Sequence, residues 1–405
     1  ATVNPGTGNT VTINTNVTTS GTVSLQSGTL NIGAGNTLTL NSAITSTGGT
    51  LTSAANGTVS YNQGTNGQIV LSASYGNLTF SNFNKVLTNA TINIAGTFTP
   101  GSASGHTLTG STFNFNGGAQ NIPAFTFNNL TISGTANNTL TGTVIIGNAG
   151  TGTLNLDGRN LLLDGKNINI NGPLSGTGLF TLASGELITI GGSGALGNNL
   201  SFSNPNQEIL GLYIDRTGQT INFGSNATVY GLNLTNGTLG LNGNSLTLTG
   251  AVDVVSGDIA GNSASSITFA SGSSGTLKLN NSANTLGNLT VNNNDVISLG
   301  SNVTISNSLN IASGVLSIGA NTLTIDGTMT GDGSLRGSST SNVSITGTGA
   351  FGTLKMDQTT DESSNMLNNL SINRTSSGSV NLGNNKLIIN GTLTLSQGDF
   401  NIGSN

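Results

Sequence analysis

The most informative feature of this 405-residue chain is what it lacks: it has no cysteine, no tryptophan and one histidine. Charged residues make up 6% of the chain, and the formal net charge is −5. Lack of cysteine excludes disulfide bonds, and the scarcity of charge differs from the roughly 25% of an ordinary globular domain. The acidic balance argues against nucleic acid as a partner. No apolar run approaches the ~18 residues of a membrane span, so we expect no membrane insertion.

Short alternating runs of apolar and polar residues dominate what is present. Thr-Leu-Thr-Leu at 37–40 and Leu-Thr-Ile at 323–325 are typical. This period of two indicates β-strands with one buried face. Glycine and asparagine separate the runs, where they favour tight corners. No long amphipathic stretch indicates a helix, so we expect an all-β chain.

The spacing of leucines predicts how these strands are connected. Leu309, Leu316 and Leu323 follow one another at intervals of seven residues. Leu232, Leu239 and Leu246 have the same spacing. A five-residue strand and a two-residue corner leave no room for a crossover helix. Three such strands give about 20 residues per coil, within the range of solenoid repeats. We therefore predict a right-handed parallel β-solenoid with Leu, Ile and Val filling its interior.

A longer repeat is superimposed on the coils. The phrase GNLTV at 287–291 returns as NNLTI at 128–132, LGLYI at 210–214 and NNLSI at 368–372, at intervals of about 80 residues. We interpret the phrase as a register mark, a strand placed identically in every segment of about four coils. The prediction is one continuous solenoid over residues 1–405, with approximate segments 1–76, 77–127 (short and Phe-rich), 128–209, 210–286, 287–367 and 368–405 (partial).

The Phe-rich segment 77–127 allows two interpretations. Phe113 and Phe115 alternate with asparagines, as an inward-facing pair would. The same two residues could instead form an exposed aromatic platform for a surface glycan or another partner.

Both ends of the sequence stop within repeated phrases. ATVN at 1–4 aligns with LTVN at 289–292, and GDFNIGSN at 398–405 aligns with GVLSIGAN at 314–321. Because an uncovered strand edge can pair with another chain, we expect copies of the protein to join head to tail. The residues expected at this junction are Ala1, Thr2, Val3, Phe400, Ile402, Ser404 and Asn405.

Few residues are suited to catalysis. His106 is expected to be a solvated loop residue. Asp157 with Arg159 and Asp164 with Lys166 are expected to be turn residues, since a seven-residue step moves around the coil; a catalytic cleft lined by these four is the alternative. Asp357, Asp361 and Glu362 are weak candidates for a calcium site. We expect no enzyme activity, no catalytic residues and no cofactor.

The phrases NLTI, GTLNI and GNTLTL, together with the Asn/Gly/Thr richness, resemble the repeats of secreted bacterial β-solenoid surface proteins. These include filamentous-haemagglutinin-like and autotransporter-passenger adhesins and the large repeat adhesins. The resemblance implies an extracellular or cell-surface location. We therefore expect a structural subunit of a self-associating extracellular filament or matrix fibre. The alternative is the stalk or passenger region of an adhesin that binds glycan or a surface.

Overall fold

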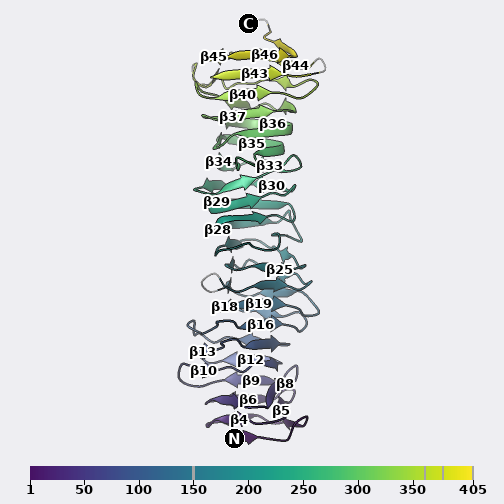
Figure 1. Cartoon of the computed structure of the whole chain (residues 1–405), viewed down its shortest axis with the longest axis vertical. Coiled ribbons are helices and arrows are strands. Elements are labelled where there is room, and N and C mark those ends of the chain that lie inside the picture. The colour runs from purple at the N-terminus through teal and green to yellow at the C-terminus, as the bar shows by residue number, and fades with distance from the viewer. Residues whose placement is uncertain (148–150, 360–361, 376–377, 404–405) are drawn as a thin grey trace. The chain divides into compact units, whose positions relative to one another are not determined.

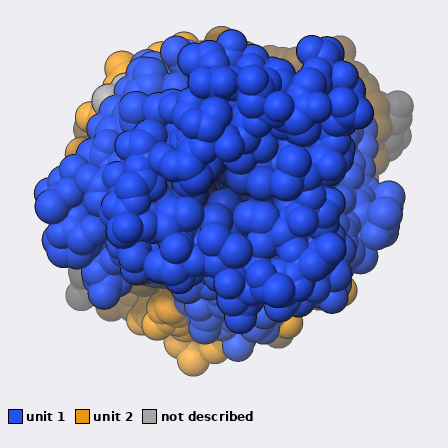
Figure 2. Space-filling view, turned by 90° about the horizontal axis from the view of Figure 1, so that it is seen from below, with its two compact units in different colours: residues 1–198 blue, residues 199–405 orange. Residues whose placement is uncertain are grey.

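The computed structural model describes residues 1–147, 151–359, 362–375 and 378–403. Every regular element in these ranges is a β-strand, so they contain no helix of the length and apolarity needed to cross a membrane. The chain forms two compact units, Ala1–Asn198 (unit 1) and Asn199–Asn405 (unit 2), which are coloured separately in Figure 2.

Each unit is a parallel β-solenoid, as the sequence predicts (Figure 1). In unit 1, for example, β4 (Val23–Leu25), β5 (Thr29–Ile32) and β6 (Thr37–Leu40) form one coil. Each of these strands pairs in parallel with a strand of the next coil, about 20 residues further on. Alternate residues of the strands point inward and are buried, so the interior is mainly a stack of aliphatic and aromatic side chains, with a few buried polar and charged residues.

The largest sheet of unit 1 has nine strands: β2 (Thr10–Ile13), β5, β8 (Thr50–Ser53), β11 (Ala73–Tyr75), β14 (Thr91–Ile94), β16 (Thr112–Phe115), β19 (Asn129–Ile132), β22 (Leu154–Leu156) and β25 (Leu174–Gly176). A five-stranded sheet contains β3 (Val17–Thr19), β6, β9 (Thr58–Tyr61), β12 (Asn77–Phe80) and β15 (Phe98–Thr99). The remaining strands are β1 (Thr2–Val3), β4, β7 (Ile44–Ser46), β10 (Gln68–Ile69), β13 (Lys85–Val86), β17 (Asn121–Ile122), β18 (Phe125–Phe127), β20 (Asn138–Leu140), β21 (Val144–Ile146), β23 (Leu161–Leu162), β24 (Ile168–Ile170), β26 (Phe180–Thr181) and β27 (Leu187–Ile190).

Unit 2 has four long strands that continue around the corners of their coils: β28 (Glu208–Asn222), β29 (Ala227–Gly240), β35 (Thr285–Leu299) and β36 (Val303–Ser317). The shorter strands are β30 (Ser245–Leu248), β31 (Ala251–Val254), β32 (Asp258–Ala260), β33 (Ser266–Phe269), β34 (Ser274–Leu277), β37 (Thr322–Ile325), β38 (Thr328–Thr330), β39 (Ser334–Arg336), β40 (Asn342–Ile345), β41 (Gly352–Thr353), β42 (Met366–Leu367), β43 (Asn369–Asn373), β44 (Ser379–Asn381), β45 (Ile388–Ile389), β46 (Leu393–Gln397) and β47 (Asp399–Asn401).

Three ladders of paired residues define the faces of unit 2. Ladder 1 contains Leu246, Ile267, Leu289, Leu309, Met329, Gly352, Val380 and Phe400. Ladder 2 contains Leu212, Leu232, Val252, Gly275, Ile297, Leu316 and Leu335. Ladder 3 contains Val303, Leu323, Val343, Leu370 and Leu393. Leu309, Leu316 and Leu323 therefore lie on successive faces, which confirms that a seven-residue step leads to the next face.

The predicted role of the repeated phrase as a register mark is wrong. Its central leucines in unit 2 are Leu212, Leu289 and Leu370, and they lie on ladder 2, ladder 1 and ladder 3 respectively. Coil lengths vary, because Thr112 pairs with Asn129 only 17 residues later, whereas Asn342 pairs with Asn369, 27 residues later. A fixed interval of about 80 residues therefore does not correspond to a whole number of coils.

Asparagine side chains extend the ladders at the corners. The Oδ1 atom of Asn302 accepts the backbone N–H of Thr322 at 2.8 Å, and that of Asn129 accepts the N–H of Thr153 at 2.9 Å. In both cases the amide oxygen replaces a carbonyl where the chain turns away from the sheet. Because a buried or half-buried N–H is costly to leave unpaired, these contacts give a physical reason for the abundance of asparagine.

Candidate functional site

The coil that contains β46 and β47 has an open apolar surface. Leu393, Leu395 and Ile402 are 43%, 54% and 53% exposed, whereas most aliphatic residues of the solenoid interior are fully buried. In the described structure β46 is in register with β43 and β47 with β44, and no strand is described along the opposite edge of either. Phe400, one of the predicted junction residues, is half-buried on β47.

The coil that begins with β1 has a similar open edge. In the described structure β1, β2 and β3 each pair with a single strand, and Val11 on β2 is 42% exposed. Of the predicted junction residues, Ala1 and Thr2 are exposed and Val3 is half-buried. The N-terminal amine donates a hydrogen bond to the Thr22 carbonyl at 2.7 Å. Ser404 and Asn405 lie outside the described residues.

The interpretation of Phe113 and Phe115 as an exposed aromatic platform is wrong. Phe113 and Phe115 have no exposed surface, so neither can bind a ligand on the outside of the coil. The rings instead pack with the other phenylalanines of this segment: Phe113 lies 5.3 Å from Phe98 and 5.1 Å from Phe127, measured between ring centroids. On β16 the two rings alternate with outward Thr112 and Asn114, which explains why both rings point into the core.

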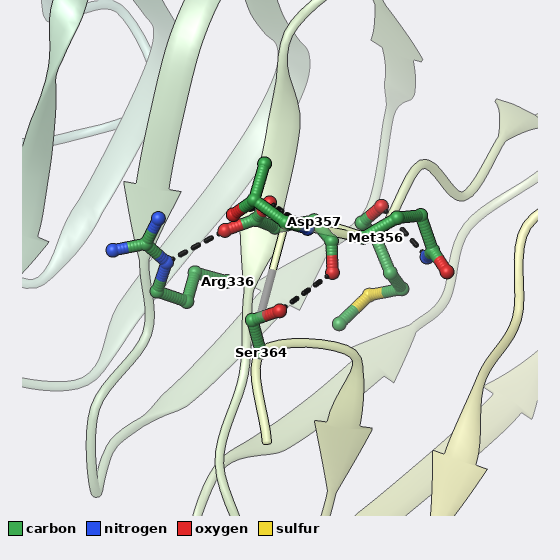
Figure 3. A network of polar contacts seen from close by, with 6 residues as sticks. Arg336, Met356, Asp357 and Ser364 are labelled. Carbon is green, nitrogen blue, oxygen red and sulfur yellow. Dashed lines mark hydrogen bonds and ion pairs between the residues drawn. The ribbon is translucent and has the colours of Figure 1, made fainter. Parts of the chain in front are cut away.

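Asp357, the first acid of the candidate calcium site, is bound by hydrogen-bond donors of the protein itself. Asp357 Oδ2 accepts a hydrogen bond from Arg336 Nε at 2.7 Å, and Oδ1 accepts from the Thr359 hydroxyl and N–H (Figure 3). Burial raises the pKa of the Asp357 carboxyl, but these donors and the guanidinium lower it more, so the net shift is downward.

The other two candidates give no support to a shared ion site. Glu362 forms an exposed ion pair with Lys386 at 2.7 Å. Asp361 lies outside the described residues. Within the ranges that the structure describes, no group of three or more His, Asp or Glu side chains is arranged to hold a metal ion.

Asp157, Arg159, Asp164 and Lys166 are turn residues, as predicted, at two successive corners. The two aspartates are exposed, and Asp164 has a φ of 50°. Arg159 Nε donates to the Gly134 carbonyl at 2.8 Å. Glu186, the nearest further acid, is fully buried, and its Oε1 accepts the N–H of Gly165 at 3.2 Å.

His106 is not the solvated loop residue that the sequence led us to expect. Its ring packs 5.7 Å from Phe80 and 5.3 Å from Phe125, and its Nδ1 accepts the Lys85 N–H at 2.9 Å. Burial lowers the pKa of His106; the Ala103 carbonyl opposes this shift and the Lys85 charge adds to it. The ring lines a cavity of about 310 Å³ between the 100–106 loop and Phe125.

Lys85, beside His106, was missed at the sequence level. Its side chain is fully buried, and Nζ donates to Ser81 Oγ at 2.7 Å. Burial lowers the pKa of Lys85 to about 8. The surrounding sequence, NFNKVL, gives only a partial signal: Lys85 alternates with the buried Leu87, but Phe83 on the same alternation is 40% exposed, and a lysine there would normally be assigned to the surface.

No protein-family model, no curated protein and no solved structure matches this chain.

Proposed function

We propose that this chain is an extracellular structural protein whose copies join end to end, the coil of β46 and β47 of one copy against the coil of β1–β3 of the next. The observation that carries the proposal is the exposure of Leu393, Leu395 and Ile402 beside free strand edges. Exposed strand edges and apolar groups at the end of a repeat stack are the surfaces that further coils of the same fold cover.

The energetics support such a contact. Covering the exposed halves of Leu393, Leu395 and Ile402 would contribute roughly 1 kcal/mol each. Pairing the free edges adds backbone hydrogen bonds in the same parallel geometry that already joins the coils. The two surfaces belong to different ends, so the contact is heterologous and each added copy offers a new free end. Low charge favours stacking, because like charges on adjacent strands repel.

A charge placed in this junction tests the proposal. Leu395→Lys and Val11→Lys should each prevent association in sedimentation velocity, because an ammonium buried between two coils is strongly unfavourable. The matched control is Val255→Lys: Val255 is 60% exposed and lies on a corner of unit 2, away from both end coils. We expect the Val255→Lys control to associate and both junction variants to remain separate. Unchanged association of both junction variants would exclude this contact.

A further inference from the structure

Two of the four tyrosines lie on the outside of unit 2. Tyr213 on β28 is 43% exposed and Tyr230 on β29 is 49% exposed, whereas Tyr61 and Tyr75 in unit 1 are fully buried. Neither exposed ring serves the solenoid core, and neither belongs to the end coils. Both rings are therefore available to solvent on the outside of their coils.

The strand register places Tyr213 in an outward column of polar side chains, next to two small residues. Tyr213 pairs with Asn233, and Asn233 pairs with Asp253, so the three form one outward column across three coils. Beside this column Gly231 and Ala251 leave a hollow of about 170 Å³, which Tyr213, Asn233 and Asp253 also line.

Tyr230 lies next to this hollow. It directly precedes Gly231, and a Cβ atom added at Gly250 would meet the Tyr230 ring at 3.0 Å. Absence of a side chain at Gly250 therefore allows the ring to lie against the next coil, beside Ala251.

The charge of the hollow is negative. Asp253 Oδ2 accepts a hydrogen bond from Asn233 Nδ2 at 3.1 Å, and Asn233 Oδ1 accepts from the Thr235 hydroxyl at 2.8 Å. This chain of hydrogen bonds fixes the carboxylate without neutralising it. Asp215 is held in the same way by Asn236 at 2.7 Å. None of the three ion pairs among the described residues involves Asp253 or Asp215.

We propose that this hollow binds a small organic cation of the quaternary-ammonium class. The face of an aromatic ring attracts a cation, and a fixed carboxylate adds a Coulombic attraction. An anionic ligand would be repelled by Asp253, the carboxylate that lines the hollow. The volume of the hollow suits a compact alkylammonium group. This site is independent of the end-to-end contact.

Choline is the direct probe, and 3,3-dimethyl-1-butanol, its uncharged analogue, is the matched ligand control. Selective isotope labelling of tyrosine gives four ring signals, of which those of buried Tyr61 and Tyr75 report an intact fold. Choline should shift the Tyr213 signal in a saturable manner, and 3,3-dimethyl-1-butanol should not. Tyr213→Ala should weaken choline binding between about twofold and fivefold. Asp253→Asn should weaken it and reduce its dependence on salt.

The same titration contains the results that would overturn the proposal. Equal shifts with choline and its uncharged analogue would make the hollow a simple apolar patch. A shift with methyl glucoside and none with choline would make it a saccharide site. A Tyr213 signal that moves with protein concentration alone would identify a contact between copies. No shift with any of these probes would exclude a site. Val255→Ala, a change outside the hollow, should leave choline binding unaltered.

Discussion

Leu289 and Leu370 occupy the same position in two copies of one phrase, yet they lie on different faces of unit 2. Leu289 pairs with Leu309 on ladder 1, whereas Leu370 pairs with Val343 on ladder 3. Copies of the phrase therefore form similar strands, but these strands lie on different faces of the solenoid. Successive segments present different residues on any one face, which explains how a repetitive sequence can contain a local feature such as the hollow beside Tyr213.

Arg374 is expected to be essential for the stability of unit 2. Its side chain is 1% exposed, and its guanidinium donates to carbonyls of earlier coils, among them Gly349 at 2.9 Å and Thr348 at 2.5 Å. Replacing Arg374 with Met would leave several partly buried carbonyls without these donors. We expect the free energy of unfolding in urea to fall by about 3 kcal/mol or more.

A variant of similar length and charge change provides the control for Arg374→Met. Lys386→Met removes only the exposed ion pair with Glu362 and should leave the urea midpoint nearly unchanged. Equal, small effects of the two substitutions would show that the carbonyl contacts of Arg374 contribute little.

Glu186→Gln should stabilise unit 1. Glu186 is fully buried, and its Oε2 has no hydrogen-bond partner among the described residues. Gln120, at a comparable buried position, uses its Nε2 to donate to the Ile94 and Gly96 carbonyls at 2.9 and 2.7 Å. An amide at position 186 offers the same donors in place of the unpaired carboxyl oxygen. The free energy of unfolding should rise by about 1 kcal/mol. Asp164→Asn, on an exposed turn, should have no effect; a loss of stability in Glu186→Gln would contradict this account.

Stability should rise with pH above about 8 because of Lys85. The folded-state pKa of Lys85 is about 8, below its ordinary 10.5. Between these values the unfolded chain binds more protons than the folded chain, so the free energy of unfolding increases with pH, by at most roughly 3 kcal/mol. Urea midpoints measured from pH 7.5 to 10 test this. Lys85→Met should be more stable at pH 7.5 and should lose the rise, whereas Lys386→Met should keep it.

The buried tyrosines should reverse this trend at higher pH. Burial raises the pKa of Tyr61 from 10.0 to about 12, and burial also raises that of Tyr75. Above pH 10 the unfolded chain releases protons that the folded chain retains, so stability should fall again. A urea midpoint that continues to rise beyond pH 11 would contradict burial of this pair. Tyr61→Phe should weaken the fall.

Local patterns in the sequence were sufficient to predict the strands and their order on the coil. Leu309 and Leu323 each lie between polar neighbours, and the seven-residue steps through Leu316 predict the change of face. The same alternation in LGLYI places Leu212 inward and Tyr213 outward, so the exposed ring could have been recognised from sequence. The Phe113 and Phe115 pair followed this rule as well.

Loop lengths and buried charges could not be derived in this way. The face on which Leu370 lies depends on the combined lengths of several unequal corner segments. A small error in the predicted length of each segment therefore accumulates along the chain. Glu186 and Arg374 each have a hydrogen-bond partner in another coil: the Gly165 N–H lies 21 residues from Glu186, and the Gly349 carbonyl lies 25 residues from Arg374. Lys85 is buried with its Nζ donating to Ser81 within the same coil. Composition and periodicity do not reveal such partners.

Electron microscopy with fibre diffraction of the purified chain over a range of concentrations tests the central claim most directly. End-to-end stacking of coils predicts unbranched filaments whose spacing of about 4.8 Å runs parallel to the filament axis. The Leu395→Lys chain should give no filaments at the same concentrations. Separate particles of the unaltered chain at every concentration, or filaments with this spacing across their axis, would contradict end-to-end assembly.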